Sequence, residues 1–322
     1  MIHNKSKLEL SEFCSLQMRC SLSGHRLDVE ARAVALGYFD GVHRGHSRLL
    51  KTTIAVAAKH KIRSAVFTFS NLPLKSGGNQ ILSSEEKITR LYQSGIDEVV
   101  AVKWEPKIYN LSPRAFVDEV LLQDLHAQVV ICGRDFHFGK NAEGNIELLQ
   151  KMAGEYGFEV VVVDDVEVDG IKVSSSVIRE QISSGDVSAA GHYLGYPYYL
   201  KGQVISGQQL GRKLGFPTLN LQYPDELCKP HFGVYASQVL HGGECLQAVS
   251  SVGIRPTVNS QDHNVLLETY VYDREFNLYG EEITVELLSF IRDEIKFASV
   301  EELRQQVERD KQNVLAYHLN KS

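Results

Sequence analysis

Two histidines three residues apart lie in a glycine-rich turn in the first part of the chain. His43 and His46 belong to residues 37–46, which read Gly-Tyr-Phe-Asp-Gly-Val-His-Arg-Gly-His and follow the apolar run 33–36. Ligands of open α/β sheets bind beyond the carboxyl ends of strands, and glycines there let the backbone approach a phosphate at a helix N-terminus. Because residues three apart in a helical turn face one side, we expect both imidazoles to hydrogen-bond a triphosphate and to stabilise charge that develops on transfer. Two surface histidines in a turn are the alternative.

A second glycine-rich stretch, residues 207–221, combines residue types that bind phosphate and metal. A loop that folds over phosphate oxygens is suggested by three glycines and two basic residues, Gly207, Gly211, Gly215, Arg212 and Lys213. Pro217 fixes the backbone before Thr218 and Asn220, whose side chains project to one side if the chain is extended there. Both offer oxygen atoms, the ligands that Mg²⁺ prefers. A glycine-rich hairpin without a ligand is the alternative.

Composition and charge limit the class of protein. The chain has 322 residues, of which 43% are apolar and 23% are charged, and its formal net charge is −6. These are ordinary globular proportions. A chain of this length is predicted to form two domains or one large barrel. A chain with a net negative charge is a poor general nucleic-acid binder. Five cysteines without a C-x-x-C pair favour a reduced compartment. Since no apolar run approaches the roughly 18 residues of a membrane span and the start is not signal-like, we expect a cytoplasmic protein that binds neither membrane nor nucleic acid.

The first half alternates short apolar runs with amphipathic stretches. We expect strands at 33–36, 65–69, 98–102, 128–132 and 159–163, none of which alternates polar and apolar residues. Helices are expected at 47–60, after the capping box Ser83-Ser84-Glu85-Glu86, and after Ser112-Pro113. Strands of this kind separated by helices indicate a parallel sheet covered on both faces, which is a Rossmann-like α/β fold.

The chain changes character near Gly191. Residues 196–199, Tyr-Pro-Tyr-Tyr, are typical of a junction, and short strand-like runs follow at 202–205, 234–240, 247–252, 266–272 and 283–290. Five or six short strands without intervening helices favour an antiparallel β-barrel. A last helix begins at Ser299 with Glu302 as its capping partner. We therefore predict two domains, residues 1–194 and residues 195–322.

The turn at residues 37–46 resembles the His-x-Gly-His nucleotidyltransferases, and its longer string resembles the FAD synthetase module of prokaryotic bifunctional riboflavin kinase/FMN adenylyltransferases. Residues 133–139, Gly-Arg-Asp-Phe-His-Phe-Gly, and residues 173–179, Val-Ser-Ser-Ser-Val-Ile-Arg, resemble two further segments of that module. The resemblance implies that His43 and His46 are catalytic. It implies nucleotide and phosphate binding by Gly37, Phe39, Asp40, Gly41, Gly45, Gly133, Asp135, Phe136, Ser174, Ser175, Ser176 and Arg179. No Walker P-loop occurs in the sequence.

Residues 207–221 resemble the riboflavin kinase signature, and residues 233–236, 252–257 and 278–280 resemble blocks that follow it in the family. The resemblance implies nucleotide binding by Gly207, Gly211, Arg212, Gly215, Pro217 and Thr218, a Mg²⁺ site at Thr218 and Asn220, and flavin contacts at Arg255, Thr257 and Arg292. Glu268 lies in the strand-like run 266–271, where a solvated surface glutamate is the ordinary interpretation. It matches the glutamate that the family uses as the base on the ribityl 5′-hydroxyl.

The chain departs from the family's pattern after the second expected strand. The family usually has Phe-x-Pro-His-Pro, whereas this chain has Phe69-Ser70-Asn71-Leu72-Pro73, so that histidine is replaced by leucine. The main hypothesis is a bifunctional enzyme that phosphorylates riboflavin to FMN and adenylylates FMN to FAD with release of pyrophosphate, using ATP and Mg²⁺. One alternative is a riboflavin kinase whose adenylyltransferase half is weakened at Asn71 and Leu72. Another is a flavin-binding regulatory module without catalysis.

Overall fold

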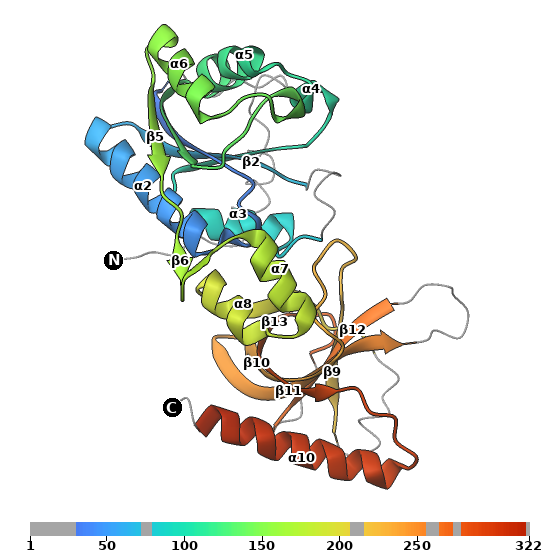
Figure 1. The fold of residues 1–322 in the computed structure, drawn as a ribbon. Coiled ribbons are helices and arrows are strands. Elements are labelled where there is room, and N and C mark those ends of the chain that lie inside the picture. The colour runs from blue at the N-terminus through green and yellow to red at the C-terminus, as the bar shows by residue number, and fades with distance from the viewer. Residues whose placement is uncertain (1–29, 72–78, 207–215, 256–263, 273–277, 320–322) are drawn as a thin grey trace. The chain divides into compact units, whose positions relative to one another are not determined.

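Two large sheets organise the chain, one parallel and one antiparallel (Figure 1). The computed structural model describes residues 30–71, 79–206, 216–255, 264–272 and 278–319. The chain divides into two compact units, Met1–Val173 and Ser174–Ser322. Each unit contains one of the two sheets and is described by itself.

The first unit is built on a five-stranded parallel sheet in the order β3-β2-β1-β4-β5. Its strands are β1 (Arg32–Leu36), β2 (Arg63–Phe69), β3 (Glu98–Val102), β4 (Ala127–Gly133) and β5 (Glu159–Val163). Every residue of the central strand β1 is buried, as an apolar run without polar alternation predicts. The predicted α/β fold is confirmed, and the carboxyl ends of these parallel strands lie along one edge of the sheet.

Helices connect the parallel strands. After β1 come the 3₁₀ turn η2 (Asp40–Val42) and α2 (Arg44–His60), and α3 (Ser84–Gln93) packs against β3 and η2. The remaining elements of the unit are α4 (Pro106–Tyr109), α5 (Pro113–Ala115), the π-helical segment η4 (Phe116–Asp124), η5 (Lys140–Ala142), α6 (Ile146–Tyr156), β6 (Glu167–Val168) and β7 (Ile171–Lys172). The hydroxyls of Ser83 and Ser112 accept the N–H groups of Glu86 and Ala115. Both predicted N-caps are therefore confirmed.

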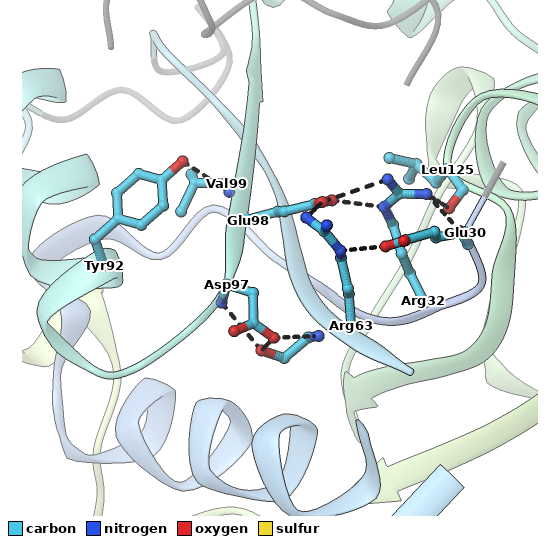
Figure 2. A network of polar contacts seen from close by, with 9 residues as sticks. Glu30, Arg32, Arg63, Tyr92, Asp97, Glu98, Val99 and Leu125 are labelled. Atoms are coloured by element: carbon cyan, nitrogen blue, oxygen red, sulfur yellow. Dashed lines mark hydrogen bonds and ion pairs between the residues drawn. The ribbon is translucent and has the colours of Figure 1, made fainter. Parts of the chain in front are cut away.

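A polar network joins the amino ends of β1, β2 and β3 (Figure 2). Arg32 is fully buried, and its guanidinium donates to the Glu98 carboxylate at 2.6 Å and to the carbonyl oxygens of Glu30 and Leu125. Arg63 pairs with the same carboxylate at 2.9 Å. The hydrogen bonds of the buried cation are thus made within the fold, at the sheet edge opposite the carboxyl ends of the strands.

The second unit is built on a six-stranded antiparallel sheet in the order β8-β13-β10-β11-β12-β9. Its strands are β8 (Tyr198–Gln203), β9 (Thr218–Gln222), β10 (Gly233–His241), β11 (Glu244–Arg255), β12 (Asn264–Val271) and β13 (Glu282–Asp293). The two edges of the sheet meet just after β8, where the N–H of Ile205 donates to the carbonyl oxygen of Asn220 in β9 at 2.9 Å. The sheet therefore curls into a partly closed barrel, which confirms the predicted architecture.

The start of the barrel differs from the prediction. The first strand begins at Tyr198 and not at residue 202, so the expected junction at 196–199 is partly strand. Tyr198 and Tyr199 are buried, and the Tyr198 hydroxyl donates to the carbonyl oxygen of Cys228 at 2.5 Å. A tyrosine whose hydroxyl finds an acceptor packs as a core residue, which the tyrosine- and proline-rich composition of this segment concealed.

Helices flank the antiparallel sheet of the second unit. α7 (Ser175–Ser184) and α8 (Val187–Leu194) precede it, and α8 packs against β8 and β13. This packing explains why α7 and α8 belong to the second compact unit, which begins at Ser174. The domain boundary between residues 194 and 195 stays a prediction. α10 (Val300–Leu319) follows Ser299, whose hydroxyl accepts the Glu302 N–H, while the Glu302 carboxylate accepts the Ala298 N–H. The predicted capping box is confirmed.

Removing the carboxylate charge at Glu98 should destabilise the first unit. Glu98→Gln leaves the buried Arg32 guanidinium without its ionised partner, and breaking a buried pair costs on the order of 3–5 kcal/mol. Because 18% of the Glu98 side chain is exposed, solvent screens part of the interaction and we expect about 2 kcal/mol or less. The free energy of unfolding, measured by urea titration, gives the loss.

Glu105→Gln is the matched control for Glu98→Gln, because Glu105 forms an exposed ion pair with Lys107. Exposed pairs contribute about 0–1 kcal/mol, so the control should lose less stability than Glu98→Gln. Equal losses in the two variants would contradict the role assigned to the buried network.

Candidate active sites

The histidine turn lies at the carboxyl end of β1, in the middle of the parallel sheet. His43 is the N-cap of α2, and its Nδ1 accepts the backbone N–H of His46 at 3.3 Å. The two imidazoles stack, with ring centroids 3.6 Å apart and an interplanar angle of 18°. Since Nδ1 of His43 accepts a hydrogen bond, the neutral ring carries its proton on Nε2. The structure therefore brings both predicted histidines together and orients one of them through the helix cap.

His46 presents a buried polar atom without a partner. Its Nδ1 is buried and has no hydrogen bond within the described residues. Burial, the neighbouring His43 and the positive charge of Lys87 together lower the pKa of His46 well below its usual range. The imidazole is therefore uncharged at neutral pH. An unsatisfied buried nitrogen is costly unless a ligand meets it.

The backbone around the histidines requires small residues at two positions. Gly41 has φ 77°, a left-handed conformation that favours glycine. A Cβ on Gly45 would lie 3.1 Å from the His43 ring. Asp40 is buried, and its Oδ1 accepts the N–H of Ile81 at 2.9 Å. These contacts place the predicted residues Gly37, Phe39, Asp40, Gly41 and Gly45 in one turn with the histidines.

Lys87 is a residue of this site that the sequence analysis missed. It lies on α3 and is 5% exposed, and its Nζ donates to the carbonyl oxygen of Phe69, the last residue of β2, at 2.5 Å. Burial lowers the pKa of Lys87 to about 8, and the Asp40 carboxylate opposes that shift. The available signal was its position: Lys87 is four residues before the buried Leu91, on the apolar side of the helix.

The loop after β4 leaves the same edge of the parallel sheet. Gly133 ends β4, the neighbour of β1, and Phe136 in the following turn stacks on Phe138 with centroids 5.8 Å apart. Asp135 is exposed and pairs with Lys172 at 3.2 Å. The predicted nucleotide ligands Gly133, Asp135 and Phe136 are thus brought to the edge that carries the histidines, while their binding roles stay predictions.

Asn71, one of the two residues that depart from the family's pattern, has a structural partner. Its Oδ1 accepts the backbone N–H of Trp104 at 2.7 Å. The bond links the loop after β2 to the loop after β3, and a proline side chain has no acceptor for it. Leu72, the other departure, lies outside the described residues.

The serine-rich segment 174–179 begins α7. The Ser174 hydroxyl caps the helix by accepting the Val177 N–H, and Arg179 Nη2 donates to the Ser176 hydroxyl at 3.4 Å. The segment is part of the second compact unit. It stays a prediction that this segment, Ser175 included, binds phosphate together with the histidines.

In the antiparallel sheet, strand register collects the residues predicted for the second site. Asn220 of β9 lies directly opposite Glu268 of β12, and Thr218 lies opposite Tyr270. Glu268 in turn faces Ser251 of β11. Since directly opposed residues of an antiparallel sheet share a face, Thr218, Asn220 and Glu268 project from the same side of the barrel. The predicted metal ligands and the predicted base are therefore neighbours.

The side chain of Asn220 is oriented so that an oxygen remains for a ligand. Its Nδ2 donates to the carbonyl oxygen of Thr218 at 3.3 Å, and its Oδ1 is buried without a hydrogen-bond partner among the described residues. The Oε1 atom of Glu268, across the strand pair, is also buried. A hard divalent cation takes amide, hydroxyl and carboxylate oxygens, so the Thr218 and Asn220 side chains fit such an ion.

Arg292, predicted as a flavin contact, anchors α10. Its guanidinium donates to the buried Asp310 carboxylate from Nη2 at 2.7 Å and from Nε at 3.0 Å. A cavity of about 570 Å³ lies beside the helix and is lined by Phe216, Glu301, Arg304, Gln305, Glu308 and Arg309. Pro217, between that phenylalanine and β9, is half-buried. The other predicted residues Gly207, Gly211, Arg212, Gly215 and Thr257 lie outside the described residues, as does the side chain of Arg255.

Within the described ranges, no group of three or more histidine, cysteine, aspartate and glutamate side chains is placed to hold a metal ion. None of the helices in the part of the chain that the structure describes is long and apolar enough to cross a membrane.

Comparisons with known proteins match nearly the whole chain. A family model for FAD synthetase matches residues 26–177, and one for riboflavin kinase matches residues 194–318. A bifunctional riboflavin kinase/FMN adenylyltransferase of Listeria monocytogenes is 35% identical over 89% of this chain and 92% of its own length. Proteins of the same name from Escherichia coli strain K12 and Bacillus subtilis strain 168 are each 34% identical, over 87% and 92% of this chain and 91% and 96% of their own.

A solved structure shares the fold. The crystal structure of a protein named as a macrolide-efflux protein, from Streptococcus pneumoniae, matches with a TM-score of 0.79 at 30% sequence identity, and covers 88% of this chain and 93% of that one. That name applies to the Streptococcus protein alone, and the similarity to this chain is one of fold and sequence.

Proposed function

The chain belongs to the family of bifunctional riboflavin kinase/FMN adenylyltransferases, and we propose that its two reactions use two separate sites. It phosphorylates riboflavin to FMN and adenylylates FMN to FAD, with ATP as the co-substrate of both steps. The observation that carries the division is the placement of two unsatisfied buried polar atoms among the described residues. Nδ1 of His46 lies in the parallel-sheet unit, and Oδ1 of Asn220 lies in the barrel.

The barrel site is proposed to carry the kinase reaction. The ribityl 5′-hydroxyl oxygen attacks the γ-phosphorus of ATP, the bond from that phosphorus to the β,γ-bridging oxygen breaks, and ADP leaves. The hydroxyl proton goes to the Glu268 carboxylate, which acts as the general base. Glu268 suits this role because it lies on a rigid strand, directly opposite Asn220. The glycines at 207, 211 and 215 and Arg212 are the proposed contacts of the nucleotide phosphates.

A divalent cation, proposed to be Mg²⁺, fits beside the base. The Thr218 hydroxyl and Asn220 Oδ1 would hold it, and the hydrogen bond from Asn220 Nδ2 to the Thr218 carbonyl oxygen fixes the amide in the required orientation. When bound, the cation neutralises negative charge on the ATP phosphates. The flavin is proposed to bind near α10, together with Arg255 and Thr257. Arg292 contributes by holding α10 through Asp310.

The histidine turn is proposed to carry adenylyl transfer. A phosphate oxygen of FMN attacks the α-phosphorus of ATP, the bond to the α,β-bridging oxygen breaks, and pyrophosphate leaves. No proton needs to be removed from an ionised phosphate, so the site must mainly stabilise charge. The His43 Nε2–H and the His46 ring, at the positive end of α2, meet this requirement. The serines at 174–176 and Arg179 are the proposed contacts of the β- and γ-phosphates, and the proposed functional boundary lies between residues 194 and 195.

The cytoplasm is the proposed location, since Cys132 and Cys245 are free thiols among the described residues. Replacement of the family's histidine by Leu72 favours one second candidate, a kinase with a weakened adenylyltransferase.

Separate loss of the two reactions tests the proposed division. Glu268→Gln removes the proton acceptor, so FMN formation from riboflavin should fall by a factor on the order of 10²–10⁴, while FAD formation from supplied FMN should persist. His46→Ala should give the reverse, with FMN accumulating. Chromatographic separation of the flavins measures both rates.

Glu226→Gln is the control for the kinase variant, because Glu226 is an exposed glutamate of the same unit. It should leave both rates unchanged. If Glu268→Gln or His46→Ala abolishes both reactions in a chain that remains folded by circular dichroism, the assignment of two sites is wrong.

The departure at Leu72 generates a separate prediction. Leu72→His restores a hydrogen-bonding side chain, and a hydrogen bond to a charged group contributes about 1.5 kcal/mol or more. FAD formation from FMN should therefore rise roughly tenfold, and riboflavin phosphorylation should stay constant. Leu74→His, two residues further along, is the matched control and should change neither rate. An unchanged rate of FAD formation in Leu72→His would show that this position does not limit adenylyl transfer.

A further inference from the structure

A buried ammonium group lies at the functional edge of the parallel sheet. Lys87 Nζ has three N–H donors, and the Phe69 carbonyl oxygen is the one acceptor that the described residues give it. No ion pair of Lys87 with a carboxylate is present among the described residues. Its neighbours are Asp40 from η2 and His46 from α2, both close enough to interact with its charge. The ammonium is therefore withdrawn from water without full compensation.

The other buried cation of the same sheet shows what a structural role looks like. Arg32, at the amino ends of the strands, donates to a carboxylate and to two carbonyl oxygens (Figure 2). Lys87 lacks such a set of acceptors among the described residues. Burying a charge that is only partly paired destabilises a fold, and an apolar residue of similar volume would serve packing as well or better. Packing alone therefore does not account for a lysine at this position.

The position of Lys87 joins three parts of the adenylyl-transfer site. α3 packs on η2, which carries Asp40, and the Lys87 side chain reaches the end of β2. The Ser84 hydroxyl of the same helix donates to the carbonyl oxygen of Ser70, the first residue after β2. The charged and titratable groups that act on the His46 ring are His43, from the cap of its own helix, and Lys87, from α3. Lys87 thus holds the backbone at the end of β2 and places a positive charge near the His46 ring.

We propose that Lys87 is a positioning residue for adenylyl transfer, which holds the end of β2 beside the histidine turn and adds positive charge next to the His46 imidazole. The inference rests on the proposed function of the histidine turn. An uncharged His46 avoids repulsion from Lys87 in the free enzyme. When the anionic phosphates of ATP arrive, they favour positive charge on both groups, so His46 gains a proton more readily against the substrate than in the free enzyme.

Lys87→Gln isolates the charge, because a glutamine amide can still donate to the Phe69 carbonyl oxygen. We expect kcat for FAD formation from FMN to fall on the order of 10- to 100-fold with a smaller change in KM, while riboflavin phosphorylation by the same chain stays constant. Loss of the neighbouring positive charge also raises the pKa of His46. The His46 C2–H proton resonance, assigned with the His46→Ala variant, should therefore titrate at higher pH than in the unsubstituted chain.

Two further variants keep the result interpretable. Lys107→Gln, at an exposed lysine of the same unit, should change neither reaction. Lys87→Arg retains a cation and should keep the His46 titration near that of the unsubstituted chain; it also serves if Lys87→Gln does not fold. The inference would be overturned if the His46 titration is unaltered in Lys87→Gln, or if the titration in Lys87→Arg follows that of Lys87→Gln. Equal losses of both reactions in Lys87→Gln would also overturn it. Absence of FAD formation by the unsubstituted chain would instead refute the proposed function.

Discussion

A polar atom removed from water must find a partner, and this requirement separates the structural from the functional parts of the molecule. At the amino ends of the parallel strands, the buried Arg32 guanidinium is met by the Glu98 carboxylate and by backbone carbonyl oxygens. At the carboxyl ends, Lys87 and Nδ1 of His46 are buried with fewer partners. An unsatisfied buried group costs about 1–3 kcal/mol, and a ligand bound at this edge would complete both groups.

In the barrel, strand register brings the proposed site residues together. Asn220 and Glu268 are 48 positions apart in the sequence and directly opposed in the sheet. Moving the pairing of β9 and β12 by one residue would turn these two side chains to opposite faces, and Glu268, the proposed base, would lose its neighbour. The bridge from Ile205 to Asn220 closes the barrel at the same residue. The proposed kinase site therefore lies where the barrel closes.

Local features of the sequence predicted the elements, and long-range features decided what they brought together. The caps at Ser83, Ser112 and Ser299 depend on neighbours three residues away, so they could be predicted. Lys87 could not, because a charged residue on a helix is solvated by default and only the packing of α3 on η2 buries it. The grouping of α7 and α8 with the barrel likewise depends on packing against β8 and β13. Resemblance to a family supplied the roles of Glu268 and the histidines, which composition and spacing left open.

The central claim is that one chain carries out two consecutive transfers at two sites. The most direct measurement follows all products from riboflavin, ATP and Mg²⁺ in a single reaction of the intact chain, by chromatography of flavins and nucleotides together with an assay for pyrophosphate. The account predicts that FMN appears first and then declines as FAD forms, with one ADP and one pyrophosphate released for each FAD at completion. FMN and ADP that accumulate without pyrophosphate, or a chain that binds riboflavin and releases neither product, would contradict it.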